Sequence, residues 1–266
     1  TLEPLKMPCP AALGRLAQAG VNITGALINE DPPQHTVHRQ ALQVALNPRR
    51  LRELESFVRD EARKSMDKII QRGHADLMND FAFWIPAHVV FHMMRVPEED
   101  IPQIKQWVAG TAKFIWGIPT EAEQETLAAN LGEYWKYTAA HLKKLQADLQ
   151  DDFVSEMIRQ HLADPVTWPF DYVTWLTLNF MFAGHETAAG GMGNGIRLVL
   201  ENLDQWQMLV DDPSLIPNAV EEMLRHTGPV LAWRRITTQE MEFSGVRVPA
   251  GARLKVMLGG ANRDGR

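Results

Sequence analysis

A chain of 266 residues with 45% hydrophobic and 23% charged residues has the composition of a globular protein and can bury a sizeable core. A formal net charge of -6 leaves no overall basic surface, so nucleic acid is not an expected partner. The single cysteine, Cys9, excludes an intrachain disulfide and a zinc site built on several thiolates. It agrees with a reducing compartment, and we expect a cytoplasmic protein. No apolar run reaches the ~18 residues of a membrane span, and no signal peptide is visible.

Helices predominate among the elements that the sequence predicts. The first 30 residues, rich in proline and glycine, predict irregular structure. The turn Asp31-Pro32-Pro33 predicts the start of a helix that runs toward Asn47-Pro48. An apolar stretch at 76–95 ends at Val96-Pro97. Helical spacing of apolar residues predicts further helices over residues 49–72, 98–117, 120–148, 150–162, 203–211 and 215–226.

The segment from Asp171 to Leu200 is long, apolar and weakly charged, which predicts a helix surrounded by protein. Helix propensity does not explain why this segment also contains four closely spaced glycines, Gly190, Gly191, Gly193 and Gly195. After Val230 the pattern changes to alternating residues, which predicts strands over Arg235–Glu242 and Ala252–Met257. The sequence therefore predicts a mainly α domain with a small β element near its end.

Within the long helix, the stretch Ala183-Gly184-His185-Glu186-Thr187 places a hydroxyl beside a carboxyl. A helical threonine can return its hydroxyl to the carbonyl four residues back, here that of Ala183. Gly184 leaves space beside that carbonyl, so the helix can open locally. These residues indicate a groove with a hydroxyl and a nearby proton source. The alternative is a buried helix that contains a threonine and a solvated glutamate by chance.

A second candidate pair is Glu222 and Arg225. Their three-residue spacing puts a carboxylate and a guanidinium on one helix face, where a charge-assisted pair can form. Such spacing also occurs by chance on many surface helices. The position of the pair, just before Gly228-Pro229 and the strand region, gives it more weight.

Five segments resemble motifs of the cytochrome P450 family, and their order along the chain is that of the family. The A-G-x-[D/E]-T motif of the family's long central helix is matched by Ala183, Gly184, Glu186 and Thr187, and its E-x-x-R motif by Glu222 and Arg225. The segment from Asp31 to Arg39 is similar to the D-P-P-x-H-x-x-x-R opening of an early helix. Arg235 with the following Glu240, Gly245, Pro249 and Gly251 resembles the R…(D/E)…G…P-x-G hairpin, and Ala261-Asn262-Arg263-Asp264 matches A-N-R-D.

The resemblance implies one partial cytochrome P450-type helical domain over residues 1–266. The family's N-terminal lobe and its F-x-x-G-x-x-x-C-x-G loop, whose cysteine ligates the haem iron, have no counterpart in these residues. We therefore expect a longer parent protein, and we expect this chain to be inactive without the thiolate ligand. Cys9 lies in a segment that resembles a substrate-side loop, so we do not expect it to be the ligand. The chain then holds no metal ligand of its own.

The resemblance also implies roles for individual residues. Thr187 with Glu186 would organise water and deliver protons during oxygen activation, and Ala183 with Gly184 would face haem b. The haem propionates would be bound by His35, Arg39 and Arg235 through charge-assisted hydrogen bonds. Glu222 and Arg225 would form a structural pair, and Val230 and Leu231 would line the substrate pocket.

The implied activity is insertion of one oxygen atom from dioxygen into an apolar organic substrate. Substrate contacts would come from residues 5–28, 110–122 and 230–233, which include Phe114, Ile115, Trp116 and Trp233, although these residues could equally be ordinary core. The expected partners are a hydrophobic small molecule, dioxygen, and a ferredoxin or flavin reductase, either separate or fused. Two alternatives stay open, a non-catalytic relative that binds a small ligand and a plain helical interaction domain.

Overall fold

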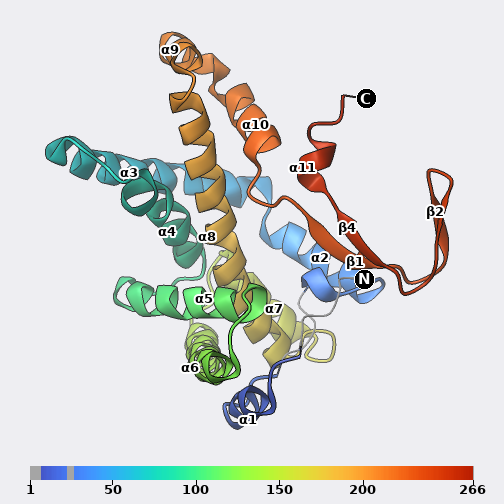
Figure 1. Cartoon of the computed structure of the whole chain (residues 1–266). Helices are drawn as coiled ribbons and strands as arrows, with labels where there is room; N and C mark the ends of the chain where they lie inside the picture. Colours follow the sequence, from blue (N-terminus) through green and yellow to red (C-terminus); the bar gives the residue numbers. More distant parts are fainter. Residues whose placement is uncertain (1–6, 23–26, 266) are drawn as a thin grey trace. The chain divides into compact units, whose positions relative to one another are not determined.

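The computed structural model describes residues 7–22 and 27–265, and it is mainly helical (Figure 1). Its helical elements are α1 (Pro10–Gln18), η1 (Leu27–Asn29), α2 (Gln34–Ala45), α3 (Pro48–Arg72), the π-helical η2 (Met78–Ala82), α4 (Trp84–Met93), η3 (Glu98–Asp100), α5 (Ile101–Trp116), α6 (Glu121–Leu145), α7 (Phe153–Ala163), α8 (Phe170–Leu200), α9 (Leu203–Asp211), η4 (Pro213–Leu215), α10 (Ile216–Thr227) and α11 (Leu258–Ala261). The strands are β1 (Trp233–Ile236), β2 (Met241–Phe243), β3 (Val246–Val248) and β4 (Arg253–Val256). The predicted mainly α fold with a small β element is confirmed.

The described chain divides into two compact units. One comprises residues 7–22, 27–58 and 88–183, and we call it the α6 unit. The other comprises residues 59–87 and 184–265, and we call it the α10 unit. Helices α3, α4 and α8 contribute residues to both units.

Helix α6 provides much of the core of the α6 unit. Its buried residues include Leu131, Tyr134 and Leu142, each at most 1% exposed. A capping box starts the helix, because the Thr120 side chain accepts a hydrogen bond from the Glu123 backbone N–H and the Glu123 carboxylate accepts one from the Thr120 N–H. The sequence-predicted helix over 120–148 therefore begins where its capping residues place it.

Helix α1 corrects the prediction that the first 30 residues are irregular. Pro10 occupies the first turn of this helix, where the missing N–H costs nothing, so it begins a helix instead of breaking one. Ala12 and Leu16 are buried, and α1 packs against α6. Tertiary burial of this short apolar face stabilises a segment that looks irregular from its proline and glycine content.

The first half of α8 is the apolar helix that the sequence predicts. Its buried residues in the α6 unit include Val173, Leu178 and Met181. The Tyr134 hydroxyl of α6 donates a hydrogen bond of 3.3 Å to the carbonyl oxygen of Leu178. A helix with polar residues on few positions can persist here because protein surrounds it.

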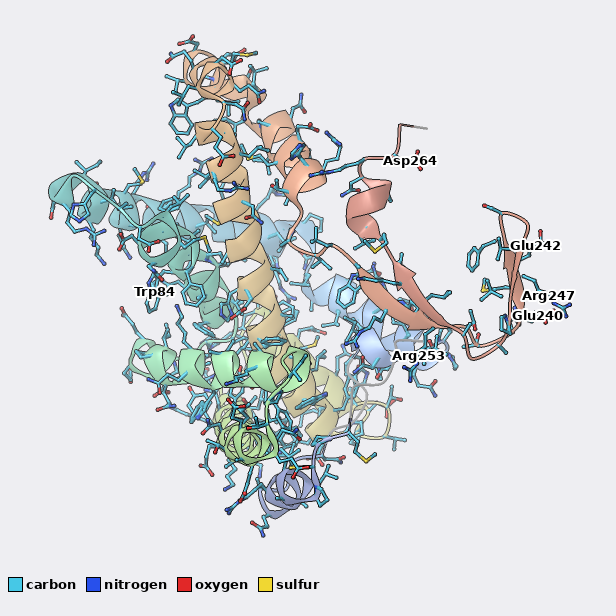
Figure 2. All side chains as sticks on the ribbon, viewed as in Figure 1. Trp84, Glu240, Glu242, Arg247, Arg253 and Asp264 are labelled. Atoms are coloured by element: carbon cyan, nitrogen blue, oxygen red, sulfur yellow. The ribbon has the colours of Figure 1, made fainter. Side chains whose placement is uncertain are left out.

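The β element departs from the predicted strand over Arg235–Glu242. Strand β1 ends at Ile236 and pairs antiparallel with β4, whereas β2 and β3 form a separate hairpin. The buried Thr237 causes the break, because its Oγ1 donates to the Pro249 carbonyl at 2.7 Å and accepts from the Ala252 N–H at 2.9 Å. These bonds turn the chain away from β1. The hairpin beyond carries the exposed Glu240, Glu242 and Arg247 (Figure 2).

Over residues 7–22 and 27–265, we find no helix that has both the length and the apolar character needed to cross a bilayer.

Candidate functional site

The motif Ala183–Thr187 lies at the centre of α8, which is helical from Phe170 to Leu200 (Figure 1). Glu186 and Thr187 are exposed, whereas His185 is 1% exposed. The His185 ring lies 6.0 Å from the Phe83 ring in an edge-on arrangement. The hydroxyl and the carboxyl are therefore accessible, and the imidazole is part of the interior. The helical backbone continues through Gly184, and the local opening expected there stays a prediction.

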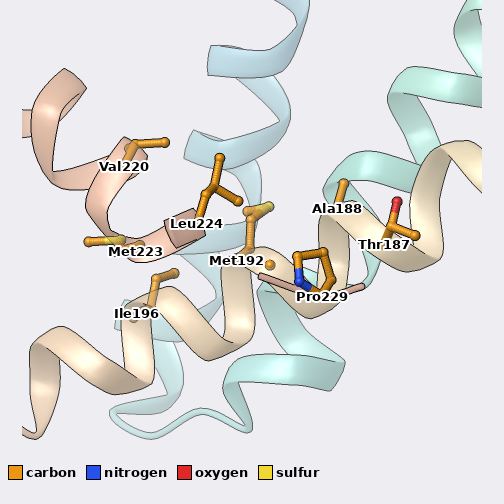
Figure 3. Close-up of a pocket in the computed structure, with 9 residues that line it drawn as sticks. Thr187, Ala188, Met192, Ile196, Val220, Met223, Leu224 and Pro229 are labelled. Carbon is orange, nitrogen blue, oxygen red and sulfur yellow. The ribbon is translucent and has the colours of Figure 1, made fainter. Parts of the chain in front are cut away.

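A cavity of about 580 Å³ lies beside Thr187 in the α10 unit (Figure 3). Helix α8, helix α10 and the segment after α10 line it with Thr187, Ala188, Gly191, Met192, Ile196, Val220, Met223, Leu224 and Pro229. Among these lining residues, Thr187 has the one hydroxyl. The cavity thus combines apolar walls with a single group that can exchange a proton. It is suited to an apolar group and to ordered water near Thr187.

The glycines of α8 let other side chains approach the helix closely. A Cβ atom at Gly191 would lie 3.6 Å from Leu224 and 3.7 Å from Pro229, both of which line the cavity. A Cβ atom at Gly195 would come within 2.9 Å of the Met223 Sδ and 3.1 Å of its Cβ. The close approach of Met223 on α10 therefore explains Gly195, although helix propensity disfavours a glycine there. Sequence reasoning noted these glycines but missed this role.

Glu222 and Arg225 form a bidentate ion pair on α10. The Arg225 Nε and Nη2 donate to the two Glu222 carboxylate oxygens at 2.6 Å each. The hydrogen bonds from Arg225 lower the pKa of Glu222 below its ordinary value. The same guanidinium donates through Nη1 to the Asn262 carbonyl at 2.7 Å. Two segments that the sequence treats as separate motifs are therefore joined directly.

A second hydrogen bond strengthens this junction. The Arg263 Nη2 donates to the His226 carbonyl at 2.9 Å, close to the end of α10. Arg225 and Arg263 thus cross-connect α10 and the segment that follows α11. The Glu222–Arg225 ion pair is solvent-exposed, so it contributes to the geometry of this junction more than to the stability of the fold.

No protein-family model matches the chain. The chain is 30% identical over 256 residues to cytochrome P450 130 of Mycobacterium tuberculosis, across 95% of this chain and 62% of that relative. It is 31% identical over 242 residues to the vitamin D(3) 25-hydroxylase of Pseudonocardia autotrophica, across 91% of this chain and 58% of that relative. The chain therefore spans about three fifths of the length of these curated relatives.

The fold is similar to that of the same group of proteins as the sequence. The crystal structure of the Acinetobacter radioresistens CYP116B5 heme domain matches 99% of this chain with a TM-score of 0.91 and 35% identity, and 64% of that domain is covered. This chain belongs to the cytochrome P450 family. The P450-type helical fold predicted from the motifs is confirmed, and haem b is the cofactor of this family.

Because cytochrome P450 proteins bind haem, this chain should carry cationic residues that can bind the haem propionates. In the α6 unit, His35 is half-buried and Arg39 is exposed, one helical turn apart on α2, so both side chains belong to one face of the helix. In the α10 unit, Arg235 lies on β1 opposite Leu254 of β4. Its guanidinium lies 5.7 Å from the Trp233 ring centre, and its Nη1 donates to the Arg234 carbonyl at 2.9 Å. These residue types fit carboxylate groups such as haem propionates.

The axial ligand of a cytochrome P450 is a cysteine thiolate. Cys9 is the one cysteine of the chain. In the α6 unit it precedes α1, with its Sγ 3.8 Å from the Glu121 carbonyl and its backbone N–H bonded to Gln124. These contacts tie Cys9 to the start of α6. Within the described part of the chain, we find no group of three or more His, Cys, Asp or Glu residues that could hold a metal ion.

The expected substrate residues of this cytochrome P450 lie in several places. Val230 is half-buried, whereas Leu231 is 66% exposed and its carbonyl accepts a hydrogen bond from Gly259 at the start of α11. Phe114 and Ile115 are half-buried on α5. The side chain of Trp116 and residues 5, 6 and 23–26 lie outside the described part of the chain. Val230 and Leu231 do not line the cavity beside Thr187.

Proposed function

We propose that the protein containing this chain is a haem-thiolate monooxygenase, which inserts one oxygen atom from dioxygen into an apolar organic substrate. The observation that carries the proposal is the Thr187 hydroxyl at the edge of an apolar cavity on α8. Relatives of the chain support the reaction class, since they include a steroid C26-monooxygenase and an erythromycin C-12 hydroxylase. Only the class of reaction is carried over, because the chain spans 64% and 62% of these two relatives.

Cationic side chains of this chain would hold the cofactor. His35, Arg39 and Arg235 would donate charge-assisted hydrogen bonds to the two propionates. Ala183 and Gly184 would lie against the macrocycle, since neither has a side chain larger than a methyl group. Haem with a thiolate axial ligand supplies the activation of dioxygen. The cysteine for that ligand would come from a part of the protein other than these residues.

Thr187 and Glu186 would handle protons. The Thr187 Oγ1 can accept a hydrogen bond from one water and donate to another, so it can hold ordered water in the cavity. Glu186 is exposed and can exchange protons with solvent. Adjacent helical residues point in different directions, so a proton would pass between the two side chains through water and not directly. The two residues would thus supply protons while the apolar walls exclude bulk water.

Electrons would come from a partner. The chain has no recognisable nicotinamide or flavin motif, so a ferredoxin or flavin reductase, separate or fused, would supply them. An intact type IV self-sufficient cytochrome P450 monooxygenase is among the similar structures, with 35% identity over 99% of this chain and 34% of that protein. The apolar substrate, the pocket residues Val230 and Leu231 and a cytoplasmic location stay predictions.

The spectrum of the reduced, carbon-monoxide-treated protein tests the proposal. The protein should be made from the complete reading frame that encodes this chain, and haem should be supplied during expression. We expect the red-shifted Soret band of a haem-thiolate protein. A protein that folds and takes up no haem would refute the proposed function and favour a ligand-binding or interaction domain.

A further inference from the structure

A buried histidine on α2, not used by the proposed function, links three segments of the α6 unit. His38 is 5% exposed. Its Nδ1 lies 2.7 Å from the Glu30 Oε2, just before α2, and its Nε2 lies 3.1 Å from the Thr167 carbonyl oxygen, between α7 and α8. The Glu30 side chain is 11% exposed. Each of the two ring nitrogens therefore contacts an oxygen from a different segment.

The chemistry of the acceptors determines where hydrogen atoms must be. A backbone carbonyl can only accept, so the His38 Nε2 carries the hydrogen of that bond. The contact between Nδ1 and Glu30 needs a second hydrogen, on the ring or on the carboxyl. In either arrangement both bonds form together, and the pair has no net charge. Removal of the imidazole would leave a buried carboxylate and a buried carbonyl without these partners.

Aromatic rings hold the imidazole from two sides. The Trp168 ring lies 4.5 Å from it edge-on, and the Tyr172 ring of α8 lies 4.3 Å from it at a tilt. Tyr172 is 4% exposed, so little water reaches this cluster. This burial, and then the nearby Glu30 charge, raise the pKa of the Tyr172 hydroxyl. The ring is thus fixed in position as well as in hydrogen bonding.

The connection between α7 and α8 is itself rigid. The Asp164 carboxylate accepts hydrogen bonds from the backbone N–H groups of Val166 and Thr167 at 3.1 and 3.0 Å. The His161 Nδ1 lies 2.8 Å from the Trp168 carbonyl oxygen. Thr167 therefore offers His38 a carbonyl held in place on both sides.

We propose that His38 is a positioning residue, whose two hydrogen bonds fix the rotation of α2 about its axis and so orient His35 and Arg39. His35 and Arg39 lie three residues before and one residue after His38, so a turn of α2 about its axis would move all three together. The anionic group that His35 and Arg39 would meet is a carboxylate of the cofactor, and this part of the inference rests on the proposed function.

Hydrogen exchange at the α2 amides tests the positioning step without cofactor. In His38→Leu, which keeps an apolar side chain and loses both bonds, protection over residues 34–45 should fall about 10- to 100-fold, as expected for loss of charge-assisted bonds. His38→Gln and Glu30→Gln each put a side-chain amide, which can still form a hydrogen bond, in place of one partner. In these variants protection over residues 34–45 should fall less. His74→Leu, at an exposed histidine in the other unit, is the matched control and should leave α2 unchanged.

Haem loss from the protein made from the complete reading frame tests the second step. The rate of haem transfer to excess apomyoglobin should rise about tenfold in His38→Leu and less in His38→Gln. Unchanged α2 protection in all three variants would overturn the positioning role, whatever haem does. Lower α2 protection with an unchanged haem-loss rate would show that His38 positions α2 but has no effect on cofactor binding. If the wild-type protein binds no haem but His38→Leu still lowers α2 protection, the proposed function is refuted and the positioning role of His38 stands.

Discussion

Thr187 of α8 combines an exposed side chain with a position at the wall of a cavity. Glu186, its neighbour, is also exposed, whereas His185 on the other side is buried against Phe83. The helix thus turns its polar groups toward the cavity side and solvent and its imidazole inward. At the scale of single residues, this orientation is what makes a proton role for Thr187 testable.

Thr187→Ala should separate oxygen consumption from product formation. Without the hydroxyl, water in the cavity loses the group that orders it, so we expect reductant and oxygen to be consumed while product per oxygen falls severalfold. Steady-state assays of the complete protein with its reductase would measure both quantities. Thr187→Ser keeps the hydroxyl and should retain most of the coupling. Unchanged coupling in Thr187→Ala would remove the proton role.

Glu123 offers a second residue-scale prediction, on stability. Hydrogen bonds from Lys113, first, and from Thr120 lower the pKa of Glu123 to about 2. A carboxyl with a lowered pKa in the folded state stabilises it above the ordinary pKa of ~4.5, and this contribution is lost as the pH falls toward about 2.

Thermal unfolding of Glu123→Gln from about pH 7 down to about pH 2.5 would measure this dependence. We expect the variant to be slightly less stable than the wild type at neutral pH, because the pair is exposed. The difference should shrink as the pH falls below about 4.5. A difference that stays constant over this range would show that the carboxylate charge contributes nothing to the start of α6.

At the scale of elements, α8 works as a surface on which other elements pack closely. Its glycines differ in how much room they have: a Cβ atom at Gly195 would meet Met223 at 2.9 to 3.3 Å, whereas one at Gly190 would lie 3.6 Å from Pro229. The Met223 Cβ is close to the backbone of α10 and cannot swing aside as a flexible side-chain end can. The distance between α8 and α10, and hence the cavity wall, depends on Gly195.

Gly195→Ala and Gly190→Ala therefore should have opposite effects. Overpacking costs about 1–3 kcal/mol and alanine gains about 1 kcal/mol of helix propensity, so Gly195→Ala should lower the free energy of unfolding by up to about 2 kcal/mol. Gly190→Ala should leave the free energy of unfolding unchanged or raise it by up to ~1 kcal/mol. Urea unfolding would measure both. Equal effects of the two substitutions would contradict the close approach of Met223.

At the scale of the whole molecule, the chain accounts for a helical body of a cytochrome P450 and about three fifths of its relatives' length. Its one cysteine binds within the α6 unit to the start of α6. A haem-thiolate enzyme therefore needs its axial ligand from another part of the protein. The hydrogen bond from Arg225 to the Asn262 carbonyl joins α10 to the segment after α11.

Cys9→Ser in the complete protein tests this requirement. We expect the reduced, carbon-monoxide-treated spectrum to keep its thiolate-type Soret band at wild-type intensity, since serine preserves the size of the side chain and the ligand lies elsewhere. Loss of the band, with the protein still folded by circular dichroism, would identify Cys9 as the ligand and overturn the assignment.

Local sequence by itself determined the helical ranges and the family. Helical periodicity depends on neighbouring residues, so the ranges over 171–200, 203–211 and 215–226 agree closely with α8, α9 and α10. The capping box at Thr120 and the helix start after Asp31-Pro32-Pro33 likewise depend on neighbouring residues. The motifs around Thr187 and Glu222 could be recognised because each is a short run of residues whose chemistry does not depend on knowing its neighbours in space.

The tertiary structure decided what depends on residues far apart in the chain. The break after Ile236 comes from bonds of Thr237 to Pro249 and Ala252, and α1 depends on burial against α6. The role of Gly195 depends on its contact with Met223, and the setting of His38 depends on its hydrogen bond with the Thr167 carbonyl. A side-chain pattern cannot show these contacts, because their energy arises from atoms that folding brings together.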